Sequence, residues 1–201
     1  SVHSDGTEGD QDSSSPSISD DGRYVAFESQ ADNLIDGDTN LFPFSDIFVH
    51  DLQTGETTLV SVDSNGIQGN GDNTSPSISA DGRYVAFTSD ATNLVANDTN
   101  GNTDIFVHDL QTGATTRLSV DSSGTEGNGN SSAPAISANG QYVTFESDAD
   151  NLVGGDGNGF FDIFVYEGDP LPSNPTQSQG NNSSGSGSCF IATAASDWAD
   201  F

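Results

Sequence analysis

A block of roughly 60 residues occurs three times along this chain, and this repeat limits the possible folds more than any other feature of the sequence. Each copy opens with Ser-Pro-Ser-Ile-Ser or Ala-Pro-Ala-Ile-Ser around Pro16, Pro76 and Pro134. The three prolines recur at intervals of 60 and 58 residues. Near-identical units of this length stack on one another, because a single unit cannot bury its own hydrophobic surface. The fold of one unit therefore decides the fold of the chain.

Each copy of the repeat is predicted to contain four strands, joined by two tight turns and one longer loop. In the first copy the expected strands are residues 15–19, 23–29, 46–51 and 57–62. An Asp-Gly or Asn-Gly dipeptide between the first two strands favours the positive φ angles of a hairpin turn. Every stretch in which apolar residues follow the 3.6-residue spacing of a helix is soon interrupted by glycine, proline or an Asp/Asn cluster. This pattern excludes a helical solenoid. The sequence predicts an all-β chain of four-stranded antiparallel units.

The two strand motifs also carry a resemblance to a known family. Pro-Ser-Ile-Ser-x-Asp-Gly-Arg-Tyr-Val-Ala-Phe, followed by Asp-Ile-Phe-Val-His-Asp-Leu-Gln-Thr-Gly, resembles the TolB-like (WD40-like) β-propeller repeat over residues 1–167. The resemblance implies a β-propeller with three blades in this chain as part of a larger ring, since propellers typically have about 4 to 8 blades. Upstream blades outside this chain are the favoured explanation, and several chains sharing one ring are the other. A β-sandwich is the alternative fold.

The repeat divides the chain into six expected segments. Residues 1–14 are expected to end a preceding blade and to form an interblade loop, because Ser1 to Gly6 align with Ser61 to Gly66. The expected segments that follow are blade 1 (15–74), blade 2 (75–132), blade 3 without its fourth strand (133–168), a flexible linker (169–188) and a C-terminal element (189–201). The linker is rich in Pro, Ser, Asn and Gly, as extended tethers are.

The C-terminal element carries a second resemblance. The run Cys-Phe-Ile-Ala-Thr-Ala-Ala from Cys189 is similar to the start of the CFI-box C-terminal domain, a short sorting element of exported bacterial proteins, here truncated. The resemblance implies that Cys189 is a processing or attachment point.

Charge limits the partners of the chain. Three Lys and Arg residues against 31 Asp and Glu residues give a formal net charge of −28. Nucleic acid and anionic membranes are excluded as partners, because binding them requires a basic face. Cations or cationic surfaces are the natural partners, and no apolar run is long enough for direct membrane insertion. The acidic, lysine-free composition predicts an extracellular, cell-surface or periplasmic location.

An Asp-x-Asn element lies between the second and third strands of each copy and suggests a calcium site. Carboxylate and amide oxygens at alternate positions suit calcium, which takes six to eight oxygen ligands. The candidate ligands are Asp38, Asn40 and Asp46; Asp98, Asn100, Asn102 and Asp104; and Asp156, Asn158 and Asp162. The alternative is that these residues only stabilise turns, for which Asp, Asn and Gly are equally suited.

The sequence contains no motif that would bring catalytic residue types together in one site. His50 and His108 occupy equivalent strand positions in two copies, and no Gly-x-Ser-x-Gly motif is present. The chain is therefore expected not to be an enzyme. The expected function is an extracytoplasmic β-propeller module for binding or surface structure, assisted by calcium, with a protein or carbohydrate ligand. The alternatives are a regulatory propeller of a hydrolase, whose catalytic domain lies outside this chain, and a surface protein that self-associates.

The interblade loops, residues 4–14, 64–74 and 122–132, have two interpretations. They are either solvated connections or a recognition surface on one rim, since long loops on a rigid scaffold are where partners are recognised.

Overall fold

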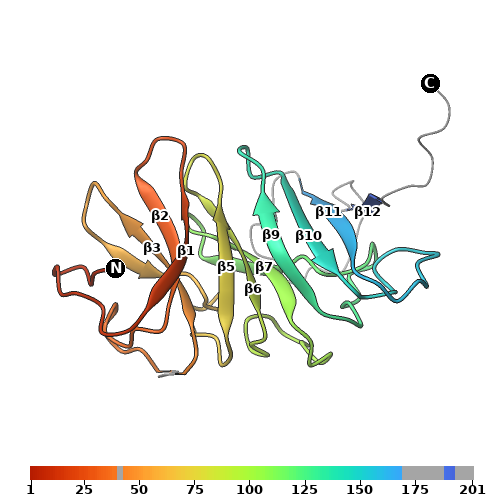
Figure 1. Ribbon diagram of the computed structural model, residues 1–201, viewed down its shortest axis with the longest axis horizontal. Coiled ribbons are helices and arrows are strands. Elements are labelled where there is room, and N and C mark those ends of the chain that lie inside the picture. The colour runs from red at the N-terminus through yellow and green to blue at the C-terminus, as the bar shows by residue number, and fades with distance from the viewer. Residues whose placement is uncertain (40–42, 169–187, 193–201) are drawn as a thin grey trace.

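Each repeat folds into one four-stranded antiparallel sheet in the computed structural model, which describes residues 1–39, 43–168 and 188–192 (Figure 1). Sheet 1 contains β1 (Ser13–Ile18), β2 (Tyr24–Ser29), β3 (Asp46–Asp51) and β4 (Thr57–Leu59). Sheet 2 contains β5 (Asn73–Ile78), β6 (Tyr84–Ser89), β7 (Asp104–Asp109) and β8 (Ala114–Arg117). Sheet 3 contains β9 (Ser131–Ile136), β10 (Tyr142–Ser147), β11 (Asp162–Glu167) and β12 (Ser188–Ala192). In each sheet the strands are paired in chain order.

The fourth strand of sheet 3 differs from the sequence expectation. β12 pairs antiparallel with β11, with Cys189 opposite Tyr166 and Ile191 opposite Phe164. Residues 133–168 contain three strands, and the fourth strand of sheet 3 comes from residues 188–192, where the expected linker meets the C-terminal element. An uncovered β11 would present unpaired backbone groups, and the Phe-Ile sequence of β12 suits a strand that pairs with them. The rest of the expected linker and C-terminal element lies outside the described residues.

The first residues of the chain form the loop that the alignment predicts. A backbone bridge joins Val2 to Glu8, as equivalent bridges join Val62 to Gln68 and Val120 to Glu126. Residues 1–8 therefore form the same bridged loop that follows sheets 1 and 2.

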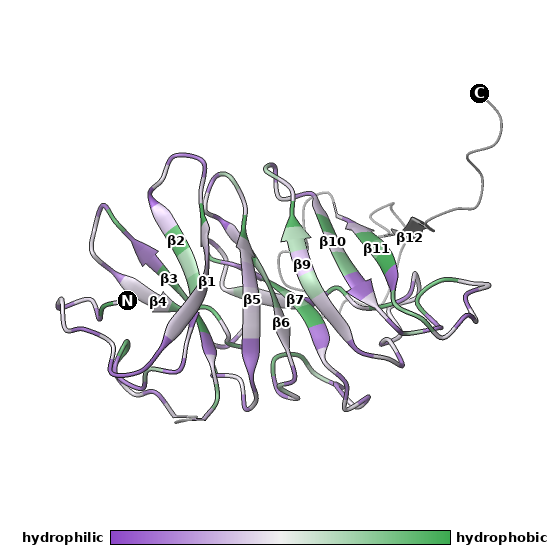
Figure 2. Ribbon diagram, viewed as in Figure 1, coloured by the Kyte–Doolittle hydropathy of each residue, from purple (hydrophilic) through white to green (hydrophobic). Residues whose placement is uncertain are grey.

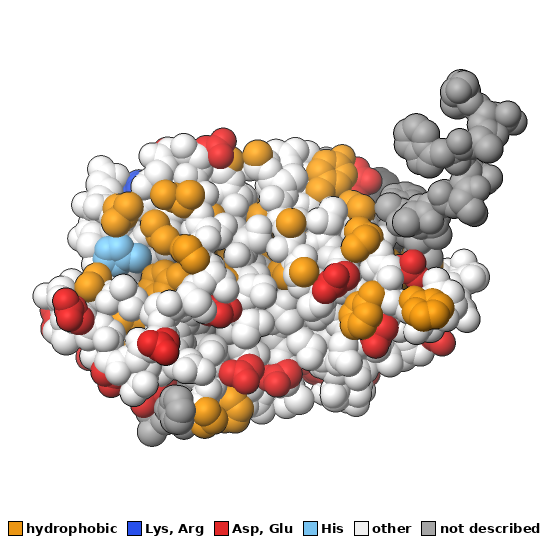
Figure 3. Space-filling view, in the orientation of Figure 1, with side chains coloured by type: hydrophobic (Ala, Val, Ile, Leu, Met, Phe, Trp, Pro, Cys, Tyr) orange, Lys and Arg blue, Asp and Glu red, His pale blue; other side chains and the backbone are white. Residues whose placement is uncertain are grey.

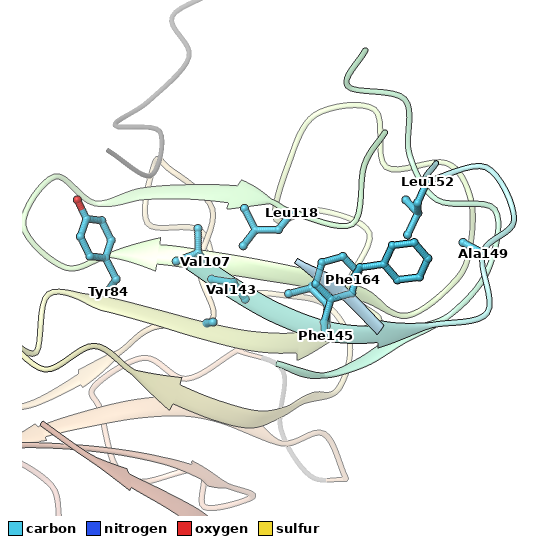
Figure 4. Packing of buried hydrophobic residues seen from close by; sticks show 10 residues of the cluster. Tyr84, Val107, Leu118, Val143, Phe145, Ala149, Leu152 and Phe164 are labelled. Carbon is cyan, nitrogen blue, oxygen red and sulfur yellow. The ribbon is translucent and has the colours of Figure 1, made fainter. Parts of the chain in front are cut away.

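Apolar side chains alternate along each middle strand, so every sheet has a hydrophobic surface on both faces. In β6, Tyr84 and Ala86 pack toward sheet 3, whereas Val85 and Phe87 pack toward sheet 1. Figure 4 shows the cluster between sheets 2 and 3, in which Val107 and Leu118 of sheet 2 lie near Phe145 and Phe164 of sheet 3. Figure 2 shows the contrast between these strands and the hydrophilic loops. The hydrophobic residues are thus concentrated in strands that are buried on two sides.

The first strands of the sheets lie side by side along the front of the molecule in Figure 1. Backbone hydrogen bonds join neighbouring sheets at the end of these strands: Asp20 N donates to the Ala80 carbonyl, and Ala80 N donates to the Ala138 carbonyl, both at 3.0 Å. Because the strands alternate in direction, the turns after the first and third strands lie at one end of the molecule. The loops after the second and fourth strands lie at the opposite end, which we call the loop rim.

Candidate functional site

The loop rim collects most of the acidic side chains. It contains the Asp-x-Asn loops and the interblade loops, whereas the described turns at the opposite end carry only Asp20, Asp21, Glu56 and Asp81. In Figure 3 most of the Asp and Glu side chains of the visible face lie along the lower part of the molecule, where these loops are. The predicted calcium ligands are part of this rim.

In the second repeat the predicted ligands surround an arginine. The Arg117 guanidinium lies 3.1 Å from Asp98 Oδ1, 3.3 Å from Asp104 Oδ2 and 3.0 Å from Glu126 Oε2. The Arg117 side chain is only 9% exposed, and those of Asp98 and Asp104 are buried further. Such a buried guanidinium requires several acidic partners, because charges removed from water are stable only when they are paired. A protein cation therefore occupies the place that the sequence assigned to calcium.

The acidic groups of this cluster respond differently to their surroundings. Burial raises the pKa of Asp98 and of Asp104, although Arg117 acts in the opposite direction. The pKa of Glu126 is lowered, first by the hydrogen bond from the Thr99 hydroxyl and also by Arg117. Arg117 thus offsets part of the effect that burial has on the pKa of these aspartates.

In the first repeat, an uncharged side chain takes the place of the arginine beside the two aspartates. Leu59 stands at the position of Arg117, and Gln68 stands at the position of Glu126. The Gln68 amide nitrogen donates to Asp38 Oδ1 and to Asp46 Oδ2, both at 2.8 Å, and its oxygen accepts from Thr39 N at 2.8 Å. A neutral amide therefore bridges the two aspartates of this repeat.

The third repeat has the most open loop of the three. Asn158 Nδ2 donates to Asp162 Oδ2 at 2.8 Å, and Asp156 is half-buried. Asn100 makes the equivalent bond to Asp104 at 2.9 Å, and Asn102 N donates to Asn100 Oδ1 at 2.8 Å as part of the turn. Asn40 lies outside the described residues.

These contacts decide how well the loops fit calcium. Among residues 1–39 and 43–168, no group of three His, Cys, Asp or Glu side chains is arranged to hold a metal ion. In the first two repeats the Gln68 amide or the Arg117 guanidinium already bridges the two aspartates, so those residues do not fit a calcium site. For the third repeat, calcium binding stays a prediction.

A set of asparagines that the sequence analysis did not single out holds the rim together. Asn93 Oδ1 accepts from Asn70 N at 2.9 Å, and Asn93 Nδ2 donates to the Gln68 carbonyl at 2.8 Å. Asn33 and Asn151 make the same pair of bonds to the preceding interblade loop. The signal was available, because Ala-x-Asn-Leu recurs in each repeat. The interblade loops are therefore tied to the adjacent sheet by paired hydrogen bonds.

Comparison with known proteins identifies the architecture. No known family model matches the sequence, and none of the curated proteins is significantly similar to it. Among solved structures, the tricorn protease is 18% identical with a TM-score of 0.50, over 85% of this chain and 16% of that protein. TolB from Acinetobacter baumannii is 25% identical with a TM-score of 0.46, over 78% of this chain and 30% of TolB. A prolyl endopeptidase is 18% identical with a TM-score of 0.48, over 82% of this chain and 21% of the endopeptidase.

The chain has a β-propeller fold. Its sheets are three blades, as the sequence predicts, and the chain spans less than a third of the TolB and tricorn proteins to which it is similar.

A groove of about 630 Å³ lies between blades 1 and 2 near the end opposite the loop rim. Its lining includes Tyr24, Asp51 and Arg83, and two of these belong to ion pairs. Arg23 holds Asp51 through two bonds of 2.9 and 2.6 Å, and Arg83 holds Asp109 in the same way at 2.9 and 2.8 Å. The bonds from Arg23 lower the pKa of Asp51 well below its usual range. The arginines of this end thus stabilise turns within their own blades.

His108 makes the stability of the propeller depend on pH. Its buried ring lies 2.8 Å from Thr115 Oγ1, and burial lowers its pKa from 6.5 to about 4. The unfolded chain therefore binds more protons between pH 4 and 6.5, so stability is greatest above pH 6.5 and falls as the pH drops toward 4. At about 1.4 kcal/mol per unit, the loss approaches roughly 3 kcal/mol.

We expect the H108Y variant to lose most of this dependence, because tyrosine occupies the equivalent position, Tyr166, in blade 3. Urea unfolding of the wild type and H108Y at pH 7 and pH 4.5 measures the difference. Equal losses of stability in both proteins would show that other groups cause the acid sensitivity.

Proposed function

We propose that the chain is an extracytoplasmic binding module, without catalytic activity, whose loop rim binds a cationic protein surface. The observation that supports this function is the rigid acidic rim, in which Asn33, Asn93 and Asn151 tie each interblade loop to the next blade. Charges held in fixed positions attract an oppositely charged partner and orient it, without the entropic cost of ordering a loop on binding. The net charge of −28 adds a long-range attraction for such a partner.

The extracytoplasmic location is part of this proposal. It is supported by the acidic, lysine-free composition of the chain. In the described part of the chain, no helix is long and apolar enough to cross a bilayer.

Titration calorimetry with a synthetic oligo-arginine peptide tests the function. Asp12 and Asp36 are exposed at the rim, and Asp20 and Glu56 are exposed at the opposite end. We expect the D12N/D36N variant to bind the peptide more weakly than the D20N/E56Q variant, which has the same net charge. Binding of both should weaken as salt is raised, because exposed charges are screened. Equal affinities of the two variants would show that only net charge matters and would remove the rim from the proposal.

Calcium assistance remains a prediction for the third repeat, where Asp156 and Asp162 lie near each other in sequence and Asn158 links to Asp162. Thermal unfolding with calcium, with magnesium and with a chelator tests it, because a ligand that binds the folded state raises its melting temperature. We expect a calcium-specific rise that the D156N/D162N variant loses and the D38N/D98N variant retains. A wild-type protein with the same melting temperature in all three conditions would exclude calcium from the function.

A further inference from the structure

The two blade interfaces of this chain are copies of each other. We call the face of a blade that points to the preceding blade its leading face and the other its trailing face. Ala26, Ile47 and Val49 on the trailing face of blade 1 pack against the leading face of blade 2. The equivalent residues Ala86, Ile105 and Val107 of blade 2 pack against blade 3. One interface design is therefore used twice within the chain.

A tyrosine and a glycine form the most specific contact of each interface. The Tyr24 ring lies on Gly82, so closely that a Cβ atom on this glycine would collide with it, and the Tyr84 ring lies on Gly140 in the same way. The next tyrosine in the series is Tyr142, which is partly exposed on blade 3. The glycine that begins the series is Gly22, and no other atom lies within 4 Å of the position of its Cβ.

Backbone contacts show the same progression. Asp20 N donates to the Ala80 carbonyl, and Ala80 N donates to the Ala138 carbonyl. The next step in this series would join Ala138 N to the carbonyl of an Asp20. A blade that follows blade 3 in the same geometry would supply that carbonyl, together with a glycine under Tyr142.

The outer faces of the terminal blades carry the apolar residues of the same interface. Ile18 on the leading face of blade 1 is 59% exposed, whereas its counterpart Ile78 in blade 2 is 7% exposed. Ile163 on the trailing face of blade 3 is 48% exposed, whereas its counterpart Ile105 is fully buried. Figure 3 shows hydrophobic side chains gathered at the end formed by blade 1. These two faces are the unmatched halves of an interface that the chain makes twice.

We propose that the leading face of blade 1 binds the trailing face of blade 3 in a second copy of this chain, so that two copies close a ring of six blades. The contact is head-to-tail, since it joins two different faces and repeats the direction of the internal interfaces. Two copies of these three blades give six, which lies within the usual range of about 4 to 8 blades. The ring places the loop rims of both copies at the same end, so self-association extends the acidic surface of the proposed function without covering it.

Light scattering after size exclusion tests the proposal in the full chain, over a range of protein concentrations. The wild type is expected at twice the chain mass of 20.8 kDa. The I18E and I163E variants each place a charge on one of the two exposed apolar faces. Each variant alone is therefore expected at the mass of a single chain. An equimolar mixture of the two is expected to restore a dimer, because the intact trailing face of I18E meets the intact leading face of I163E.

Ile67 provides the control, since it is 59% exposed in an interblade loop and lies outside both interface clusters. The I67E variant is expected to remain dimeric. Circular dichroism and thermal unfolding verify that all three variants are folded, which separates a lost interface from a lost fold. A wild type that remains a folded monomer at all concentrations overturns the proposal. A dimer that persists in I163E alone also overturns it, because that dimer would join two like faces.

Discussion

Replacing Arg117 with leucine should lower the free energy of unfolding by about 3 kcal/mol or more, because removing one partner from a buried charge cluster leaves the others uncompensated. Arg117 contacts Asp98, Asp104 and Glu126 within 3.3 Å, and its side chain is 9% exposed. Without it, burial raises the pKa of both aspartates with no guanidinium nearby to oppose the shift. Urea unfolding at pH 7 measures the loss.

The first repeat supplies a matched control for this prediction. The R117L/E126Q variant recreates the arrangement of Leu59 and Gln68, in which a glutamine amide donates to both aspartates. We expect this double variant to recover most of the stability that R117L loses. If R117L and the double variant are equally unstable, the loss arises from the packing of the arginine stem and not from the uncompensated carboxylates.

Replacing Phe106 with alanine should lower the free energy of unfolding by about 3 to 5 kcal/mol, which is the usual cost of removing a buried aromatic ring and leaving a cavity. Phe106 is fully buried between blades 1 and 2, and its ring stacks on Phe87 with centroids 5.9 Å apart. Its deletion weakens two blades at once, because the cluster includes Ile47 and Val49 of blade 1. The midpoint of urea unfolding should therefore fall markedly.

Phe161 is the control for the substitution of Phe106. Its side chain belongs to a loop of blade 3 and is more than half exposed. The F161A variant should change stability by no more than about 0.5 kcal/mol, as exposed substitutions usually do. A small effect of F106A would mean that the interface between blades 1 and 2 contributes little to the stability of the chain.

The strand pattern could be predicted because it depends on local signals. The third strand of the first repeat, Asp46–Asp51, begins and ends where the sequence indicates, since it is a continuous β-forming run. The fourth strand ends at Leu59, earlier than expected, although Val60 N still donates to the Ile47 carbonyl. The end of a strand depends on where its partner and the next loop lead the chain, and neither is a local property.

The candidate site was predicted in its position but not in its chemistry. Asp98 and Asp104 do come together, as the loop spacing indicates. Their partner is Arg117, which lies 13 residues beyond Asp104 and on another strand. A local motif identifies oxygens that can bind a cation, but it does not contain the group that neutralises them.

The amino-acid sequence alone determined the repeat and the all-β strands, because hydrophobic alternation and turn residues act over a few neighbouring positions. The resemblance of its strand motifs to the TolB-like repeat indicated the propeller fold. Only the tertiary structure decided that β12 completes blade 3, that Asn33, Asn93 and Asn151 fasten the loop rim, and that a guanidinium or an amide bridges the buried aspartates. Each of these contacts joins residues far apart in the chain. Their strength comes from burial and charge compensation, which exist only after the blades have packed together.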